Sequence, residues 1–392
     1  MSQALQELDW VSREMAALDA RRPALARALR WTWRHPTAVL VTLAVVVPGL
    51  LGANIPGGDA AWFRRAGLSM LGPDFWQVFV EPGLQVGPLY LLFLGCLTWV
   101  VGALGLPVLF TVAAVQCGLL TWLAVGTARR AARAAGVAGR RGAAVPWAVG
   151  LPVVLGGPLA EAVGNGHPEE ILVGLVLVEA ALLAAAGRRV LPGVLVGVAA
   201  GVKLWGVLGA PLLLLGRRLP DVVARCAAAA LVVLACYVPF FLLGEVNTFE
   251  FRWGVSAGST LALLGSWVPA SGWVARVVQG LAAGLAGSAV ALHRRSTPLA
   301  AVVVVVSVRL LLDPLRLTYY SGPLIVVVLL WLWTSAPVSS RSRLVLTLLT
   351  PAVVLVPYFL PAMVNGVIST LVLVAVPVGV VLLERRTVSR TR

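Results

Sequence analysis

Residues 191–203 read Leu191-Pro192-Gly193-Val194-Leu195-Val196-Gly197-Val198-Ala199-Ala200-Gly201-Val202-Lys203. This stretch opens an apolar run that continues to residue 216 and has an arginine pair at each end, Arg188-Arg189 and Arg217-Arg218. Arginine-rich connections of membrane proteins stay on the cytoplasmic side. A run with such pairs at both ends therefore predicts a broken or re-entrant hairpin, enclosed by protein or lining a cavity.

The composition places the rest of the chain in the membrane as well. Of the 392 residues, 59% are hydrophobic and only 12% are charged, about half the charged fraction of a soluble domain. Apolar runs cover nearly all of the sequence, so we expect one all-α polytopic transmembrane domain over residues 38–384, with about 10–12 membrane helices. Residues 1–37 predict a cytoplasmic amphipathic segment anchored by Trp31 and Trp33, and residues 385–392 a cytoplasmic tail.

Charge patterning predicts the orientation and the partners. The formal net charge is +15, but the arginines occur as small clusters in short connections, which excludes a nucleic-acid surface and indicates the lipid bilayer as the partner. Carboxylates gather in the other connections, at about 56–85, 161–170, 244–272 and 313–320, which we expect outside the cell. Twelve apolar runs conflict with this arrangement, so one segment within 85–126 is expected to be partial.

Asp59 is the candidate general base. It follows the first apolar run, at headgroup level, where partial desolvation strengthens a base. The alternative is a helix N-cap, a role that Asp favours, and Asp74 is expected to be a cap.

The second outer connection reads Gly164-Asn165-Gly166-His167-Pro168-Glu169-Glu170. Its two acids are expected to open a helix, where the dipole favours negative charge. His167 is expected either to contact substrate or to shape the loop, and too few nitrogen or sulfur ligands lie nearby for zinc.

Lys203 is the only lysine and lies in an apolar run, where a charge needs a cavity or a carboxylate. It predicts an anion contact, with a structural pair to Glu179 as the alternative. Arg309 and Asp313 are one helical turn apart and could pair.

The order of these features resembles bacterial GT-C glycosyltransferases of family 87, multispan enzymes that include polyprenyl-phosphate-mannose-dependent mannosyltransferases. The resemblance rests on Asp59, the glycine-containing loop before Glu169, the 191–203 segment and the stretch from Pro314 to Tyr319-Tyr320. The chain departs from the family's Gly-Gln-x-Asn loop and has Tyr319 where the family has a His-Tyr element.

The resemblance implies an inverting transfer of a sugar, mannose by analogy, from a polyprenyl phosphate to a glycolipid or glycan acceptor at the outer face of the cell membrane, without metal or cofactor. Asp59 would be the base, and the leaving phosphate would meet cationic groups. The expected substrate-binding residues are Arg64, Arg65, Asp74, His167, Glu169, Glu170, Lys203, Asp313, Arg316, Tyr319 and Tyr320. The alternative function is a non-catalytic lipid or glycan transporter, or a degenerate scaffold.

Overall fold

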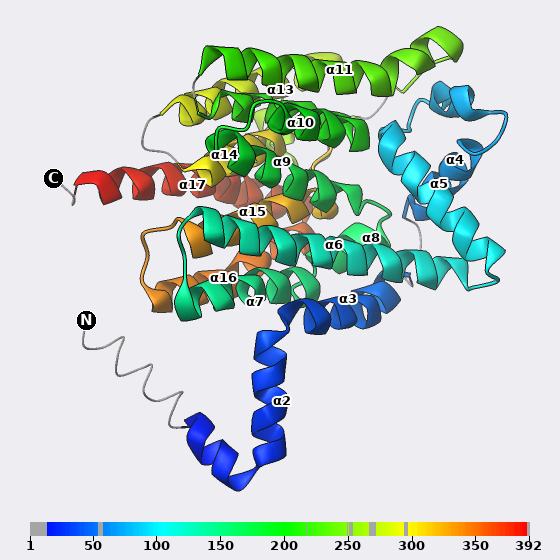
Figure 1. Ribbon diagram of the computed structural model, residues 1–392. Helices are drawn as coiled ribbons and strands as arrows, with labels where there is room; N and C mark the ends of the chain where they lie inside the picture. Colours follow the sequence, from blue (N-terminus) through cyan, green and yellow to red (C-terminus); the bar gives the residue numbers. More distant parts are fainter. Residues whose placement is uncertain are drawn as a thin grey trace.

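The computed structural model describes residues 14–53, 58–216, 218–248, 250, 254–265, 272–293 and 297–389, and all regular structure in these ranges is helical (Figure 1). Some predicted features lie partly outside these ranges: the N-terminal segment (1–13), two arginine pairs (Arg217, Arg294, Arg295) and the tail (390–392). The elements are, in order, α2 (Pro23–Arg34), α3 (Pro36–Ala53), α4 (Ala60–Ser69), η1 (Phe75–Val80), α5 (Pro88–Ala103), α6 (Val108–Ala134), α7 (Gly139–Leu155), α8 (Pro158–Gly164), α9 (Glu169–Ala185), α10 (Leu191–Val202), η2 (Leu204–Leu214), α11 (Leu219–Leu243), α12 (Thr260–Leu264), α13 (Gly272–Leu292), α14 (Pro298–Leu311), η4 (Thr318–Ser321), α15 (Gly322–Thr334), α16 (Ser340–Leu355), η5 (Val356–Phe359) and α17 (Ala362–Ser389).

The all-α, polytopic membrane fold is confirmed. Within the described ranges, five helices or helix continuations are long and apolar enough to cross a membrane, and two bent pairs raise the number to seven. The two bent pairs are α2 with α3 and α7 with α8. Further apolar helices, including α5, α10 and α14, are shorter than a full span. Of the two apolar segments within 85–126, α6 has 27 residues and α5 only 16, so α5 is the one with a partial span's length.

α2 turns away from the bundle at the start of the first membrane helix. It meets α3 at 88°, and Figure 1 shows it projecting from the body of the molecule. Trp31 and Trp33 are half-exposed, and Trp33 stacks on Trp147 with ring centroids 6.3 Å apart. A helix that lies along the membrane interface is expected to have this right angle and these exposed tryptophans.

The 190–216 run forms a broken helical hairpin, as its flanking arginines predict, and Arg225 of α11 closes its base. The guanidinium donates from Nε to Arg188 O at 2.8 Å, just before α10, and from Nη1 to Leu213 O at 3.0 Å, at the end of η2. It also donates to Ala184 O at the end of α9. Because one side chain reaches both ends of the run, the chain enters and leaves at the same level. Lys203 separates α10 from η2 at the apex.

The arginine-rich connections and the acidic loops that carry Asp59 and His167 occupy opposite ends of the helices. Arginines lie at the end of α6, the beginning of α7, the connection after α9, the beginning of α16 and the end of α17. Figure 1 shows the α6–α7 and α15–α16 connections on the left with the C-terminus, and α4 and α5 on the right. Asp59 directly precedes α4. The buried helices α9, α14 and α15 form the core beneath it.

Candidate active site

Two glycine-containing loops pack backbone to backbone and bring Asp59 to His167. The Asp59 amide donates to Asn165 O at 2.9 Å. A Cβ added at Gly58 would lie 2.6 Å from Gly164 O, and one at Gly166 only 2.3 Å from the Ala60 nitrogen. Gly166 also has φ +85°, a conformation that disfavours any residue with a side chain. These glycines therefore set the distance between the two loops.

Asp59 contacts His167 and does not cap α4. It occupies the N-cap position, but its side chain makes no capping hydrogen bond, so the capping interpretation is wrong. Instead its Oδ2 lies 2.9 Å from His167 Nε2. The Asp59 side chain is 46% exposed, whereas that of His167 is 6% exposed. The carboxylate is thus anchored on a buried ring while remaining accessible.

Both nitrogens and one face of the His167 ring are in contact with other side chains. Its Nδ1 lies 2.7 Å from Glu169 Oε1. The ring stacks on Tyr319 at 4.1 Å between centroids and 9° between planes, and Phe63 meets it edge-on at 5.0 Å. Both ring nitrogens face carboxylates, so this geometry does not match the expectation that His167 contacts the substrate directly.

Lys203, at the apex of the hairpin, holds the two acids that open α9. Its Nζ lies 2.8 Å from Glu169 Oε1 and 2.8 Å from Glu170 Oε1. The predicted alternative partner, Glu179, instead pairs with Arg130 at 2.8 Å and accepts from Thr127 at 2.6 Å. The Lys203–Glu179 pairing is therefore wrong, because Glu179 lies near the arginine end of α9 while Glu169 and Glu170 lie at its other end.

The charged network continues from Glu170 to α14 and α13. Arg309 donates to both Glu170 oxygens at 3.2 Å, while its Nε is 3.7 Å from Asp313. Asp313 accepts from Arg276 at 3.2 Å and from Gln279 at 3.3 Å. The predicted Arg309–Asp313 pair is therefore only the longest contact of a larger network, because each residue has a closer partner on another helix.

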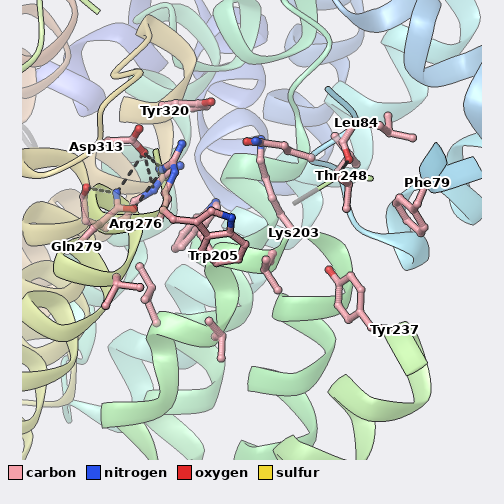
Figure 2. A pocket seen from close by; sticks show the side chains of 18 residues that line it. Phe79, Leu84, Lys203, Trp205, Tyr237, Thr248, Arg276, Gln279, Asp313 and Tyr320 are labelled. Carbon is pink, nitrogen blue, oxygen red and sulfur yellow. Dashed lines mark hydrogen bonds and ion pairs between the residues drawn. The ribbon is translucent and has the colours of Figure 1, made fainter. Parts of the chain in front are cut away.

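A cavity of about 230 Å³ adjoins this network, lined by Lys203, Arg309 and Asp313 among others. Figure 2 shows Lys203 and Trp205 at its centre, with Arg276, Gln279 and Asp313 to one side and Phe79, Leu84 and Tyr237 to the other. Its wall is mostly apolar. Three buried nitrogen donors of lining residues have no hydrogen-bond acceptor within the described part of the chain: Gln85 Nε2, Trp205 Nε1 and Arg309 Nε.

Several expected site residues lie elsewhere. Arg316 is buried and donates to Gly258 O and, at 3.0 Å, to Thr260 Oγ1, so it ties η4 to the α12 region. Asp74 is exposed and precedes η1 without a side-chain capping bond, so its predicted capping role is wrong. Arg64 lines a separate small cavity beside Gly58, and Arg65 is exposed. None of these side chains lines the cavity at Lys203.

Tyr320 does belong to the cavity, whereas several other polar lining residues were not predicted from the sequence. The Tyr320 ring lies 5.3 Å from Lys203 Nζ and 4.6 Å from the Arg309 guanidinium carbon. Arg276, Gln279 and Trp205 also line the cavity. The sequence contained one indication of Arg276 and Gln279: they are three residues apart in an apolar run, a spacing that places them on one helix face. Across the described ranges, no group of three His, Cys, Asp or Glu side chains is placed to hold a metal ion.

The fold and the site together define a polytopic membrane protein with an enclosed, charged site at one end of its bundle. The family model for glycosyltransferase family 87 matches residues 87–314, more than half of the 392-residue chain. The chain belongs to this family, a GT-C family, and is a membrane glycosyltransferase. The matched region includes Lys203 and Arg309, whereas Asp59 lies before it. No curated protein and no solved structure matches the chain.

Proposed function

We propose that the protein transfers mannose from a polyprenyl phosphate to a glycolipid or glycan acceptor at the outer face of the cell membrane. The observation that carries this proposal is the cavity beside Lys203, whose unmatched buried polar atoms are all donors: Gln85 Nε2, Trp205 Nε1 and Arg309 Nε. A ligand rich in acceptor oxygens would satisfy them, because a buried donor without a partner is costly. A phosphate bonded to a sugar is such a ligand.

The equal numbers of cations and carboxylates in the network mean that a bound phosphate would be held by hydrogen bonds from N–H groups rather than by excess positive charge. Three cations (Lys203, Arg276, Arg309) face three carboxylates (Glu169, Glu170, Asp313). Arg309 also stacks over Trp205 at 4.5 Å. Fixed donors in a desolvated site stabilise developing charge without reorganising. A singly esterified phosphate could therefore be held by N–H groups of residues already locked in ion pairs, with the apolar wall receiving the first part of the lipid chain.

The reaction would be a single displacement. The acceptor hydroxyl gives its proton to Asp59, and its oxygen forms a bond to C1 of the sugar. The bond between C1 and the phosphate oxygen breaks at the same time, and the leaving group is the polyprenyl phosphate. One displacement inverts the anomeric carbon. General-base assistance of this kind is typically worth about 10²–10⁴-fold.

The orientation follows from the arginines. Asp59 lies at the helix ends opposite those that carry Arg140, Arg188 and Arg341. Because arginine-rich connections stay in the cytoplasm, we place the site at the outer face of the plasma membrane. There it would be in reach of a lipid-linked donor and of a glycolipid or glycan acceptor.

Membranes containing the protein test this function when supplied with labelled polyprenyl-phosphate mannose, with and without EDTA. We expect a new labelled glycoconjugate in both cases, and none from membranes that lack the protein. Product with another polyprenyl-phosphate sugar alone would correct the sugar and retain the reaction. Movement of the donor across the membrane without any product would contradict the enzyme and favour a transporter.

A further inference from the structure

Both nitrogens of the His167 ring lie at hydrogen-bond distance from carboxylate oxygens. Nε2 lies 2.9 Å from Asp59 Oδ2, and Nδ1 lies 2.7 Å from Glu169 Oε1. Ionised carboxylate oxygens only accept hydrogen bonds, and a neutral imidazole has a single N–H. For both contacts to be hydrogen bonds at once, one proton must lie in each of them.

The ring cannot turn to choose other partners. Tyr319 of η4 stacks on one face, Phe63 of α4 meets it edge-on, and Lys203 Nζ lies 3.3 Å from Nδ1. Glu169 is itself held by Lys203 at 2.8 Å. An N–H at Nε2 is therefore directed at Asp59 Oδ2 from a fixed position.

We propose that His167 is a positioning residue of the transfer reaction, which fixes the Asp59 carboxylate through Nε2 while Glu169 fixes the ring through Nδ1. With Oδ2 engaged and the side chain nearly half exposed, Oδ1 is the oxygen that meets the acceptor hydroxyl. This inference rests on the proposed function, in which Asp59 takes the acceptor's proton. The loop of residues 164–170 would then orient the catalytic base.

Two substitutions of the same residue separate this role from a structural one. In His167→Gln the side-chain amide reaches the position of Nε2 and can still donate to Asp59, but the contact with Glu169 is lost. In His167→Asn the amide takes the position of Nδ1 and keeps Glu169, but loses Asp59. If His167 only stabilises the buried Glu169, the Asn variant will be the more active; if it positions Asp59, the Gln variant will be.

The measurement is kcat and donor KM of both variants in the transfer assay, with His35→Asn as the control, since His35 stacks on Trp31 at the α2–α3 bend. We expect His167→Asn to lower kcat about 100-fold, the low end of general-base contributions, and His167→Gln to lower it less, with donor KM unchanged in both. Equal kcat in His167→Asn and wild type, or a more active Asn than Gln variant, would overturn the inference.

Two further readouts keep the test decisive. If His167→Gln fails to bind donor, Phe63→Leu replaces it, because this change loosens the ring without altering charge; unchanged kcat there would count against positioning. Absence of transfer in the wild type, or full activity of Asp59→Asn, would instead reject the proposed function. An inactive Asp59→Asn beside a fully active His167→Asn would reject the positioning role alone.

Discussion

Replacing Lys203 by Met should destabilise the protein as well as weaken donor binding. Lys203 is 6% exposed, and its two contacts with Glu169 and Glu170 are each 2.8 Å long. At an effective dielectric constant near 20, one such contact is worth about 6 kcal/mol before desolvation is subtracted. Removing one partner of a buried pair costs about 3–5 kcal/mol, because a charge remains without compensation.

The loss should fall mainly on Glu169. Glu170 keeps the paired donation from Arg309 at 3.2 Å, whereas Glu169 keeps only His167, and its Oε2 has no partner within the described residues. The matched partner change is therefore Glu169→Gln, which has nearly the same shape and no charge. In the double variant Lys203→Met/Glu169→Gln we expect at least half of the lost stability to return.

The assay is the thermal unfolding midpoint of the detergent-purified proteins, read by intrinsic tryptophan fluorescence. Glu179→Gln serves as the control, because Glu179 pairs with Arg130 and should not couple to Lys203. An unchanged midpoint in Lys203→Met would refute the reasoning. So would recovery with Glu179→Gln in place of Glu169→Gln.

Three other changes follow from the same geometry. Arg225→Met should lower the unfolding midpoint, and Arg225→Lys should recover little because only a guanidinium reaches several carbonyls at once; an unchanged midpoint would show that the hairpin needs no such tie. Gly166→Ala should reduce transfer more than about 10-fold, because its Cβ would lie 2.3 Å from a backbone nitrogen and a change of 1.4 kcal/mol in the barrier is already tenfold in rate. The control is Gly136→Ala, at φ +66° with open space around it, which should remain active. Equal effects of the two changes would mean that only backbone strain matters. Trp205→Phe, which removes the indole N–H and keeps a ring over Arg309, should raise donor KM while Trp99→Phe, on an exposed face, should not, and equal donor KM in the two would remove Trp205 from donor binding.

The sequence predicted the membrane class and the hairpin at residues 190–216 because both follow from hydropathy and from the positions of the arginines. Arginines at both ends of the 190–216 run already required the chain to return to the side where it entered. The tie that closes the hairpin was not visible, because Arg225 reads in the sequence as one more basic residue near the beginning of a helix. Its acceptors are backbone carbonyls of three other segments.

The site was predicted in part, and the errors share a physical cause. Asp59, His167, Glu169, Glu170 and Lys203 were all singled out, and the structure brings these five into one network. Their pairing could not be read from the sequence, because it depends on which helix end meets the apex of the hairpin. Glu179 was the alternative partner considered for Lys203, because both residues lie in apolar runs, whereas the loop at residues 164–170 supplies the actual partners. Arg276 and Gln279 were missed because one charge and one amide do not interrupt an apolar run.

The most direct test of the central claim is the kcat of Asp59→Asn relative to the wild type and to Asp74→Asn, at saturating polyprenyl-phosphate mannose. The amide keeps the shape of the carboxylate and its contact with His167 but cannot take the acceptor's proton. We predict a loss of about 100-fold or more with donor binding retained, and little loss for Asp74→Asn, whose side chain is exposed. Equal kcat in Asp59→Asn and wild type would contradict the assignment of Asp59 as the base.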